Sequence, residues 1–348
     1  TDKVCPTPDG EIYCYPGTYQ SVPHTLHRNL GNGKFEDVTE KSGFVKAKGK
    51  GMGIAIADFD DDDRMDVFIS NDTEPNMLFM NRGDGTFSQD AMLWNVDYND
   101  LGRTVSGMGA DAKDFDNDGR VDVFVNNLMM QVWGLFRNAG DRFVYASPTT
   151  RVMGLSRRFS GWSNGFIDYD NDGWKDIYSA NGDVDYLPEN GPQRDTMFRN
   201  LEGEKFEDVG ETLGPDFTPK GYQRGSAFGD LNEDGFLDIV VTSLNRTPRI
   251  LENSGSNGNH WLLIAARGRR SNRDAIGAKM KLTTASGRVL HNHVTTSVGF
   301  MSSSDKRVHF GLGSEDEIAS LEIRWPSGTV QTLTDVPVDK VLQVEEPE

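Results

Sequence analysis

The sequence predicts an all-β protein in which repeated sheet units precede a second domain with a different strand pattern. An acidic nonapeptide occurs four times between residues 58 and 238. Strand-like segments recur in step with it, and this repetition stops near Asn259, where a new series of strands begins. Short strands at regular spacing, separated by turn residues, are typical of all-β folds.

The nonapeptide reads D-x-[DN]-x-D-G-x-x-D, with Asp63 in place of the glycine in the first copy. Carboxylates crowded in this way repel one another unless a cation lies among them, and Ca²⁺ takes roughly six to eight oxygen ligands in flexible Asp-rich loops. Glycine at the sixth position indicates a tight turn with positive φ. We predict about four Ca²⁺ ions, bound by the residues at the odd positions of each copy: Asp58, Asp60, Asp62, Arg64 and Asp66; Asp114, Asp116, Asp118, Arg120 and Asp122; Asp168, Asp170, Asp172, Trp174 and Asp176; and Asp230, Asn232, Asp234, Phe236 and Asp238.

The spacing of the motif predicts propeller blades. The first aspartates are 56, 54 and 62 residues apart, a period that favours a propeller or a solenoid. A small-residue strand precedes each copy (51–57, 106–110, 161–167 and 225–229), a β-rich strand follows it, and a third strand carries Leu-Phe-x-Asn or a close variant. With a closing fourth strand, this is the composition of a blade. Strand-like flanks argue against an EF-hand, which needs helices.

These motifs resemble the FG-GAP (integrin α-like, VCBS-type) repeat, and the whole chain resembles proteins in which such repeats precede an ASPIC/UnbV domain. The C-terminal part of the resemblance rests on the segments 259–262, 271–277, 309–313 and 324–328. The resemblance implies a calcium-binding β-propeller and a binding or adhesion role. Asp63 departs from the usual glycine, so we expect a strained loop or weaker Ca²⁺ binding there.

We divide the chain into an N-terminal segment with two cysteines (1–23), a propeller of about five blades (24–258) and an ASPIC/UnbV-like β-sandwich (259–348). The third-strand signature also occurs at 26–29, but no acidic motif precedes it. The first blade is therefore expected to lack its first two strands. Two explanations remain open: upstream blades of a longer chain, or a strand donated by a neighbouring subunit, which would build a filament.

Charge and cysteines indicate the class of protein and its compartment. The net charge of −18 resides in the repeats, because residues 259–348 hold 11 basic and 11 acidic side chains. Such acidity argues against nucleic-acid binding. Cys5 and Cys14 flank a Pro-Asp-Gly turn and are predicted to form a disulfide, which indicates an extracellular, secreted or periplasmic location. No apolar run is long enough to span a membrane.

Several other patterns have structural explanations that we favour over functional ones. Ser163 stands in a G-x-S-x-G sequence, but at a first-strand position. Arg82-Gly-Asp84 occupies a hairpin turn of the repeat. His291 and His293, like His24 and His27, are expected to be surface histidines rather than metal ligands, and most of Trp94, Trp133, Trp162 and Trp174 are expected to pack between blades. Asn71 and Asn245 begin glycosylation sequons.

We therefore expect an extracellular, non-catalytic binding or adhesion module with a structural Ca²⁺ in each complete blade. Its ligand would be a protein or a glycan contacting the propeller face. The alternative is a structural subunit of an extracellular filament or assembly, completed by strand exchange. An enzyme is the third hypothesis, because propellers also host active sites.

Overall fold

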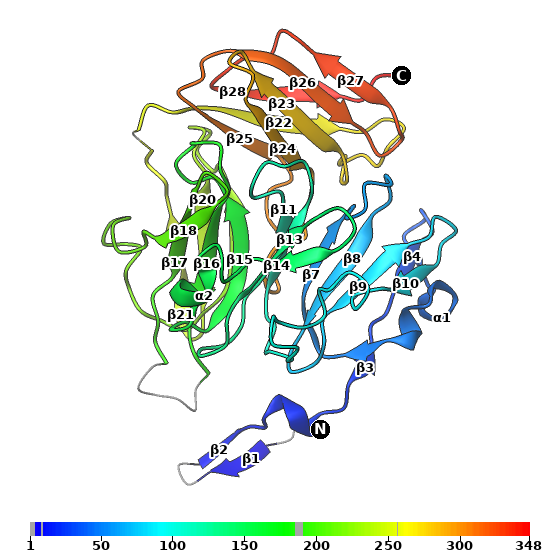
Figure 1. Ribbon diagram of the computed structural model, residues 1–348, viewed down its shortest axis with the longest axis vertical. Helices are drawn as coiled ribbons and strands as arrows, with labels where there is room; N and C mark the ends of the chain where they lie inside the picture. Colours follow the sequence, from blue (N-terminus) through cyan, green and yellow to red (C-terminus); the bar gives the residue numbers. More distant parts are fainter. Residues whose placement is uncertain (1–3, 8–9, 185–190, 256) are drawn as a thin grey trace.

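The structure is a computed structural model that describes residues 4–7, 10–184, 191–255 and 257–348. A row of small antiparallel sheets lies beneath a two-sheet sandwich (Figure 1). The helical segments are single turns, namely α1 Thr39–Ser42, α2 Val152–Ser156, η1 Pro16–Thr18 and η2 Phe44–Lys46. The chain is thus all-β, as predicted.

Four blades contain an acidic motif between their first and second strands. Three of them have four described strands each: β7 Gly51–Ala57, β8 Asp66–Asn71, β9 Met77–Asn81 and β10 Phe87–Gln89; β11 Ala110–Lys113, β12 Asp122–Val125, β13 Gly134–Asn138 and β14 Phe143–Tyr145; β15 Gly161–Ile167, β16 Asp176–Asn181, β17 Thr196–Leu201 and β18 Lys205–Asp208. The last has three, β19 Gln223–Gly229, β20 Asp238–Ser243 and β21 Arg246–Leu251. Consecutive strands pair antiparallel in every blade.

Apolar clusters between facing sheets hold neighbouring blades together. Phe68 and Val123 belong to the cluster between the β7–β10 and β11–β14 blades. Phe124 and Trp133 pack against Phe198 in the next interface, and Tyr178 packs on Phe228 in the last. Alternating side chains of each strand therefore serve two different interfaces, which is why the central strands β8, β12 and β16 are buried along their whole length.

The first blade is incomplete in the described residues. Its two-stranded sheet consists of β4 His27–Asn29 and β5 Phe35–Asp37, which matches the predicted outer pair. A further pair, β3 Val22–Pro23 with β6 Lys48–Gly49, leads into β7. Phe44 stacks on Phe79 and covers the outer face of the β7–β10 blade.

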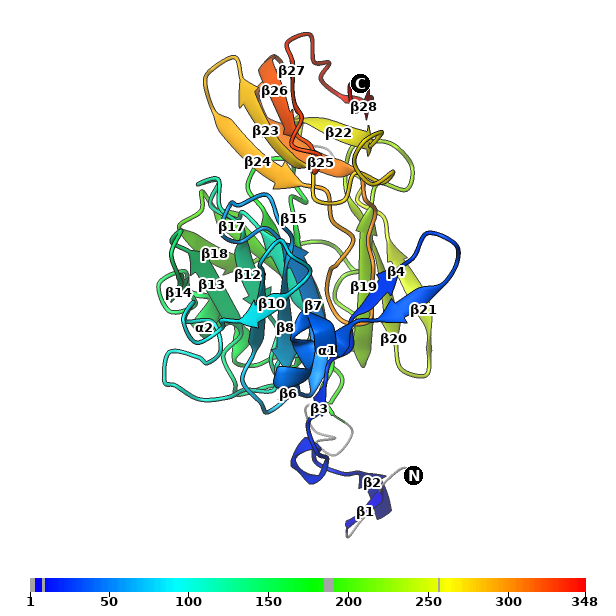
Figure 2. The ribbon, with the colours of Figure 1, turned by 90° about the vertical axis from the view of Figure 1, so that its right-hand side faces the viewer.

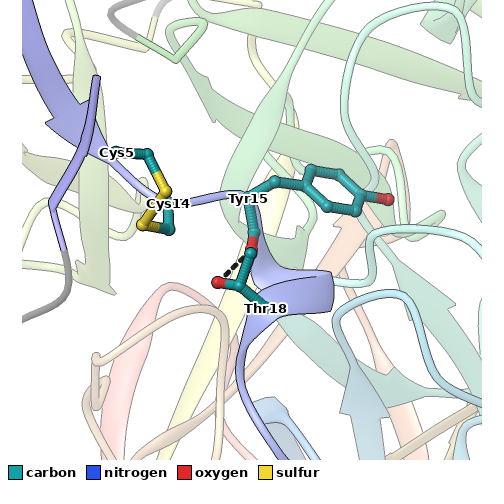
Figure 3. Close-up of a disulfide and its surroundings, with 4 residues drawn as sticks. All are labelled: Cys5, Cys14, Tyr15 and Thr18. Carbon is teal, nitrogen blue, oxygen red and sulfur yellow. Dashed lines mark hydrogen bonds between the residues drawn. A yellow bond between two sulfur atoms is a disulfide. The ribbon is translucent and has the colours of Figure 1, made fainter. Parts of the chain in front are cut away.

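The N-terminal segment is a separate hairpin that projects from the blades (Figure 2). Strands β1 Val4–Thr7 and β2 Gly10–Tyr13 pair only with each other among the described strands. Cys5 and Cys14 form the predicted disulfide across this hairpin, next to the turn in which Thr18 Oγ1 donates to Tyr15 O (Figure 3).

The C-terminal sandwich consists of a three-stranded and a four-stranded sheet. Their orders are β25-β22-β28 and β24-β23-β26-β27. The strands are β22 His260–Arg267, β23 Lys279–Thr284, β24 Val289–His293, β25 Val308–Gly313, β26 Ile318–Arg324, β27 Val330–Leu333 and β28 Lys340–Glu345. Leu262, Leu282 and Trp325 lie in the single core between the sheets. The predicted sandwich is present, although the sequence did not indicate β27.

A hairpin of the sandwich, residues 294–306, enters the axis of the propeller (Figures 1 and 2). Gly299 forms an antiparallel bridge with Ala110, and Phe300 forms one with Gly53. The Phe300 amide donates to Ser163 Oγ, and the Phe228 amide donates to Ser304 Oγ. This axial hairpin, as we call it, thus contacts the innermost strand of all four blades.

Two predicted strands begin or end elsewhere. Residues 106–110 were expected to form the first strand of their blade, but β11 starts only at Ala110, because Ser106 forms an isolated bridge with Asp72 of the preceding blade. In the last blade, Asn253 of the third-strand signature lies two residues beyond the end of β21 at Leu251. The sequence pattern located each strand, whereas contacts between blades decided its ends.

Candidate metal centres

All four acidic motifs lie in the loops that join the first and second strands, at the end of the blades that faces the sandwich. We call them loop 1 (58–66), loop 2 (114–122), loop 3 (168–176) and loop 4 (230–238). The fixed sequence spacing gives them nearly the same hydrogen-bond pattern. They therefore form four equivalent acidic sites along one face of the propeller.

Two residues in each loop have left-handed backbone conformations. The fourth position has φ between 55° and 61°, and the sixth has φ of 91°, 87° and 91° at Gly119, Gly173 and Gly235. Asp63 has the same conformation, with φ of 65°. This conformation costs a non-glycine residue about 1–2 kcal/mol. The expectation of a strained first loop is thus confirmed in its backbone.

The first aspartate folds the loop around its carboxylate. In loop 3, Asp168 Oδ1 accepts the amide of Asp172 at 3.0 Å, and Oδ2 accepts the amide of Gly173 at 2.8 Å. The same two bonds occur in the other loops. The fifth aspartate in turn accepts the amide of the seventh residue, whose side chain varies among the loops. Carboxylate oxygens retain further lone pairs for a metal.

The ninth aspartate connects the loop to the third strand. Asp122 is fully buried; its Oδ2 accepts the Phe115 amide at 3.1 Å and its Oδ1 accepts the Asn138 amide at 2.8 Å. Asp66, Asp176 and Asp238 make the corresponding pairs of bonds. This residue was predicted only as a ligand, so its role in joining the strands was missed.

The oxygens that remain fit a hard cation. Three carboxylates approach within 4.8 Å of one another in loops 1 to 3, namely Asp58, Asp60 and Asp62; Asp114, Asp116 and Asp122; and Asp168, Asp170 and Asp176. Asp170 Oδ1 is buried and accepts no hydrogen bond. Loop 4 has Asn232 at the third position, whose carbonyl is also a Ca²⁺ ligand type. These residues therefore fit Ca²⁺, which would neutralise their charge when bound.

Burial and mutual repulsion raise the pKa values of several carboxylates in these loops. Burial, and then the charges of Asp118 and Asp114, raise the pKa of Asp116 to about 6. Burial raises the pKa of Asp66 to about 7, despite the amide bonds that it accepts. The pKa of Asp168 is also raised well above its ordinary value. Such shifts indicate negative charge that the protein by itself does not compensate.

The asparagine of the third-strand signature links neighbouring loops. Asn138 Nδ2 donates to Val121 O in its own loop and to Phe59 O in the preceding one. Asn200 and Asn253 donate in the same way to the carbonyls of Phe115 and Tyr169. The sequence contained this signal, because the asparagine recurs in phase with the acidic motif, but its function was not inferred.

The sixth position of each loop faces the sandwich. A Cβ atom added to Gly173 would lie 2.6 Å from Arg288 Nη2, and one added to Gly235 would lie within the indole ring of Trp261. At Gly119 the nearest sandwich side chain is His291, and in loop 1 Arg324 pairs with Asp63. The glycines thus provide close approach as well as positive φ. Sequence reasoning missed all four sandwich residues.

The other motifs of the sequence lie mainly where they have a structural role. Ser163 is fully buried in β15. Arg82 pairs with Asp90 beside the β9–β10 turn. Asn71 is fully buried, which blocks its sequon, whereas Asn245 is exposed.

The aromatic and histidine predictions are partly corrected. Trp133 packs between blades as expected, but Trp162 lies under Arg224 and against Phe300 of the axial hairpin. His293 was expected at the surface, yet it is buried where the sandwich packs on the propeller. This burial holds the pKa of His293 well below its ordinary value.

Comparison with protein families agrees with this geometry. A model described as FG-GAP-like repeat matches residues 58–125, 114–179 and 168–241, and each match begins at the first aspartate of a loop. The chain belongs to the FG-GAP-like repeat family. A second model, described as ASPIC and UnbV, matches residues 268–348 of the sandwich. Both parts of the predicted resemblance are therefore confirmed.

Relatives of this FG-GAP repeat chain include cartilage acidic protein 1. The Xenopus tropicalis protein is 29% identical over 300 residues, and the human protein is 29% identical over 279. These alignments cover 81% and 76% of this chain but only 43% and 39% of the relatives, so the chain spans about two fifths of their length.

Solved structures resemble the chain only slightly. A lectin of Agrocybe aegerita gives a TM-score of 0.39 at 17% identity, over 67% of this chain and 58% of the lectin. Bap1, a Vibrio cholerae biofilm matrix protein, gives 0.31 at 10% identity, over 91% and 62%. Neither likeness is close enough to bear on function. Among the described residues, no helix is long and apolar enough to cross a membrane.

Proposed function

We propose that this chain is a calcium-stabilised, non-catalytic binding module that works outside the cytosol. The observation that carries the proposal is the convergence of carboxylates in the acidic loops, with Asp170 Oδ1 buried and unpartnered. Carbonyl and carboxylate oxygens are the ligands that Ca²⁺ prefers. The disulfide between Cys5 and Cys14 supports an oxidising compartment.

A structural role for the ion follows from the connections of the loops. Each loop joins the first two strands of its blade and, through the ninth aspartate, the third strand as well. In addition, Asn138 and Asn200 bond each loop to the next. An ion that fixes the loop therefore stabilises several strands at once. A protein or glycan ligand would then bind the sides or the far end of the blades, because the sandwich covers the loop end.

The absence of catalysis is part of the proposal. The G-x-S-x-G motif is the pattern that suggested a nucleophile, but Ser163 Oγ is enclosed and lies 2.8 Å from Ser226 Oγ, which donates to it. A nucleophile at an elbow needs an exposed hydroxyl. These contacts favour a binding or structural function over an enzymatic one.

The calcium proposal is tested by calorimetric titration of calcium into the metal-free protein, and by thermal unfolding with and without calcium. We expect up to four bound ions and a higher Tm, since each site filled at 100 times its Kd adds about 2.7 kcal/mol of stability. Asp170→Ala should remove the contribution of one ion. Asp141→Ala, which changes an exposed turn residue, serves as the control. Identical unfolding with chelator and with calcium would refute the proposal.

A second candidate is a subunit of an extracellular assembly. The last blade exposes Ile250 on the face that it shares with Val240 and Ala227, and no further described strand pairs with β21. A strand from a neighbour could extend such a sheet. Electron microscopy of the natively isolated protein in millimolar calcium tests this candidate. Filaments of this subunit that Ile250→Lys abolishes would support it, and discrete particles would contradict it.

A further inference from the structure

Loop 1 contacts the sandwich differently from the other loops. Lys279 Nζ of β23 lies 2.7 Å from Asp58 Oδ2 and also pairs with Asp61. Arg324 Nη1 of β26 lies 3.0 Å from Asp63 Oδ2. Lys279 and Arg324 are direct partners on neighbouring strands, so both cations project from one place on the sandwich.

In loops 3 and 4 the sandwich bonds mainly to the backbone, and its described ion pair there, Arg307 Nη1 with Glu233 Oε1 at 3.7 Å, does not involve a predicted ligand. Arg288 Nη1 donates to Asp172 O at 2.8 Å, and Arg307 Nη2 donates to Asp230 O at 2.7 Å. The amide of Gly313 donates to Asn171 O at 2.7 Å. The carboxylates of loops 2 and 3 pair instead with arginines of their own blade, such as Arg137 and Arg199. Among the described ion pairs, Lys279 is the sandwich cation that reaches a predicted ligand carboxylate.

The exceptional residue of loop 1 belongs to this contact. Asp63 replaces the glycine of the other loops despite the cost of its left-handed backbone. Its carboxylate meets Arg324, where the glycine loops leave room for an uncharged or backbone contact. An additional carboxylate at this position therefore serves the docking of the sandwich.

We propose that loop 1 is an electrostatic docking site for the sandwich, in which Lys279 competes with Ca²⁺ for Asp58. This proposal rests on calcium binding by the loops. A cation beside a ligand carboxylate opposes entry of a second cation, so Lys279 lowers the calcium affinity of loop 1. Arg137 and Arg199 act in the same way on loops 2 and 3, but they belong to the blades, so among the described ion pairs Lys279 is the one that couples calcium affinity to the sandwich. Because coupling is reciprocal, filling loop 1 weakens the contact of Lys279 with the propeller.

The first test is a calcium titration of the full chain by calorimetry. Lys279→Gln should strengthen one site roughly tenfold and leave the other sites unchanged. Lys279→Arg keeps the charge and should resemble the unchanged protein. Lys281→Gln is the matched control, because Lys281 lies two residues along β23 and lines the same cavity of about 200 Å³ as Lys279, but forms no described ion pair with loop 1. Equal affinities in all four proteins would overturn the proposal.

The second test measures the contact itself. A carbodiimide joins a lysine amine and a carboxylate that form an ion pair, with loss of water, and mass spectrometry quantifies the Lys279–Asp61 product. Its yield should fall as calcium fills the site that Lys279→Gln strengthens. The Lys306–Asp274 pair within the sandwich should give a constant yield.

The two tests separate this proposal from the calcium function on which it rests. If no calcium binds to any loop, the proposed function fails. If calcium fills the site that Lys279→Gln strengthens while the Lys279–Asp61 yield stays constant, the competition is refuted although calcium binding stands.

Discussion

Asn138 donates one hydrogen bond to Phe59 O, at 2.8 Å, across the boundary between two blades. Its Nδ2 atom also donates to Val121 O at 3.1 Å, and its Oδ1 accepts the Gly140 amide at 2.8 Å. A single buried amide thus joins its own acidic loop, its own third strand and the loop of the preceding blade. Stability of one blade is thereby coupled to the folding of its neighbour.

The inter-blade bond can be isolated by comparing two asparagines. Asn138→Ala should lower the free energy of unfolding by about 1–3 kcal/mol, because it leaves the buried Phe59 carbonyl without a donor. Asn81→Ala is the control, since Asn81 bonds Met65 O of its own loop and the first blade has no acidic loop to reach. Denaturant unfolding in the presence of calcium measures the free energy of unfolding of both variants. Equal losses would show that the bond to Phe59 contributes nothing.

The aspartates of one loop should separate into two classes. Asp122→Asn should destabilise the protein by about 1–3 kcal/mol even in chelator, because one of its two amide donors, Phe115 or Asn138, loses a carboxylate acceptor. Asp118→Asn should act mainly through calcium, so its effect should shrink when the metal is removed. Unfolding of both variants with and without calcium provides the measurement. A loss for Asp122→Asn that disappears in chelator would contradict its role in joining strands.

Glu346 makes the stability of the sandwich depend on pH in the acid range. Its enclosed carboxylate accepts the amides of Arg269, Arg270 and Ser271 and the hydroxyls of Ser271 and Ser327. Burial by itself would raise the pKa of this carboxyl, but these bonds hold the pKa at about 2. A lowered folded-state pKa adds stability above the ordinary value of 4.5, and this stability is lost as the pH falls from 4.5 towards 2.

Glu346→Gln should therefore lower the Tm of the sandwich at neutral pH, and the difference from the unchanged protein should diminish below pH 4.5. Glu348→Gln, which alters an almost fully exposed side chain, is the control. Scanning calorimetry between pH 2.5 and 7 follows both variants. A difference that stays constant down to the lowest pH would contradict the assignment.

Reduction of the disulfide should leave the rest of the chain intact. Strands β1 and β2 pair only with each other among the described strands, and Tyr15 beyond them is exposed. We expect an unchanged Tm for Cys5→Ser combined with Cys14→Ser, and faster proteolysis of the N-terminal hairpin alone. A lower Tm would indicate that the hairpin packs against the blades and would contradict this prediction.

The sequence by itself determined the blades and their acidic loops, because these depend on contacts within about sixty residues. Asp168 and Gly173, for example, lie five residues apart and meet through a single turn. The same local spacing predicted the pairing of Cys5 with Cys14. Alternation of apolar residues was likewise sufficient for most strands of the sandwich.

Only the tertiary structure decided what the loops face. Lys279 and Asp61 are 218 positions apart, and nothing in either segment encodes their meeting. The axial hairpin, the buried His293 and the contact of Arg324 with Asp63 also arise from packing of the sandwich on the propeller. Local pattern fixes which backbone groups a loop satisfies internally, whereas the partner of an outward-facing charge depends on the surface that folding brings opposite it.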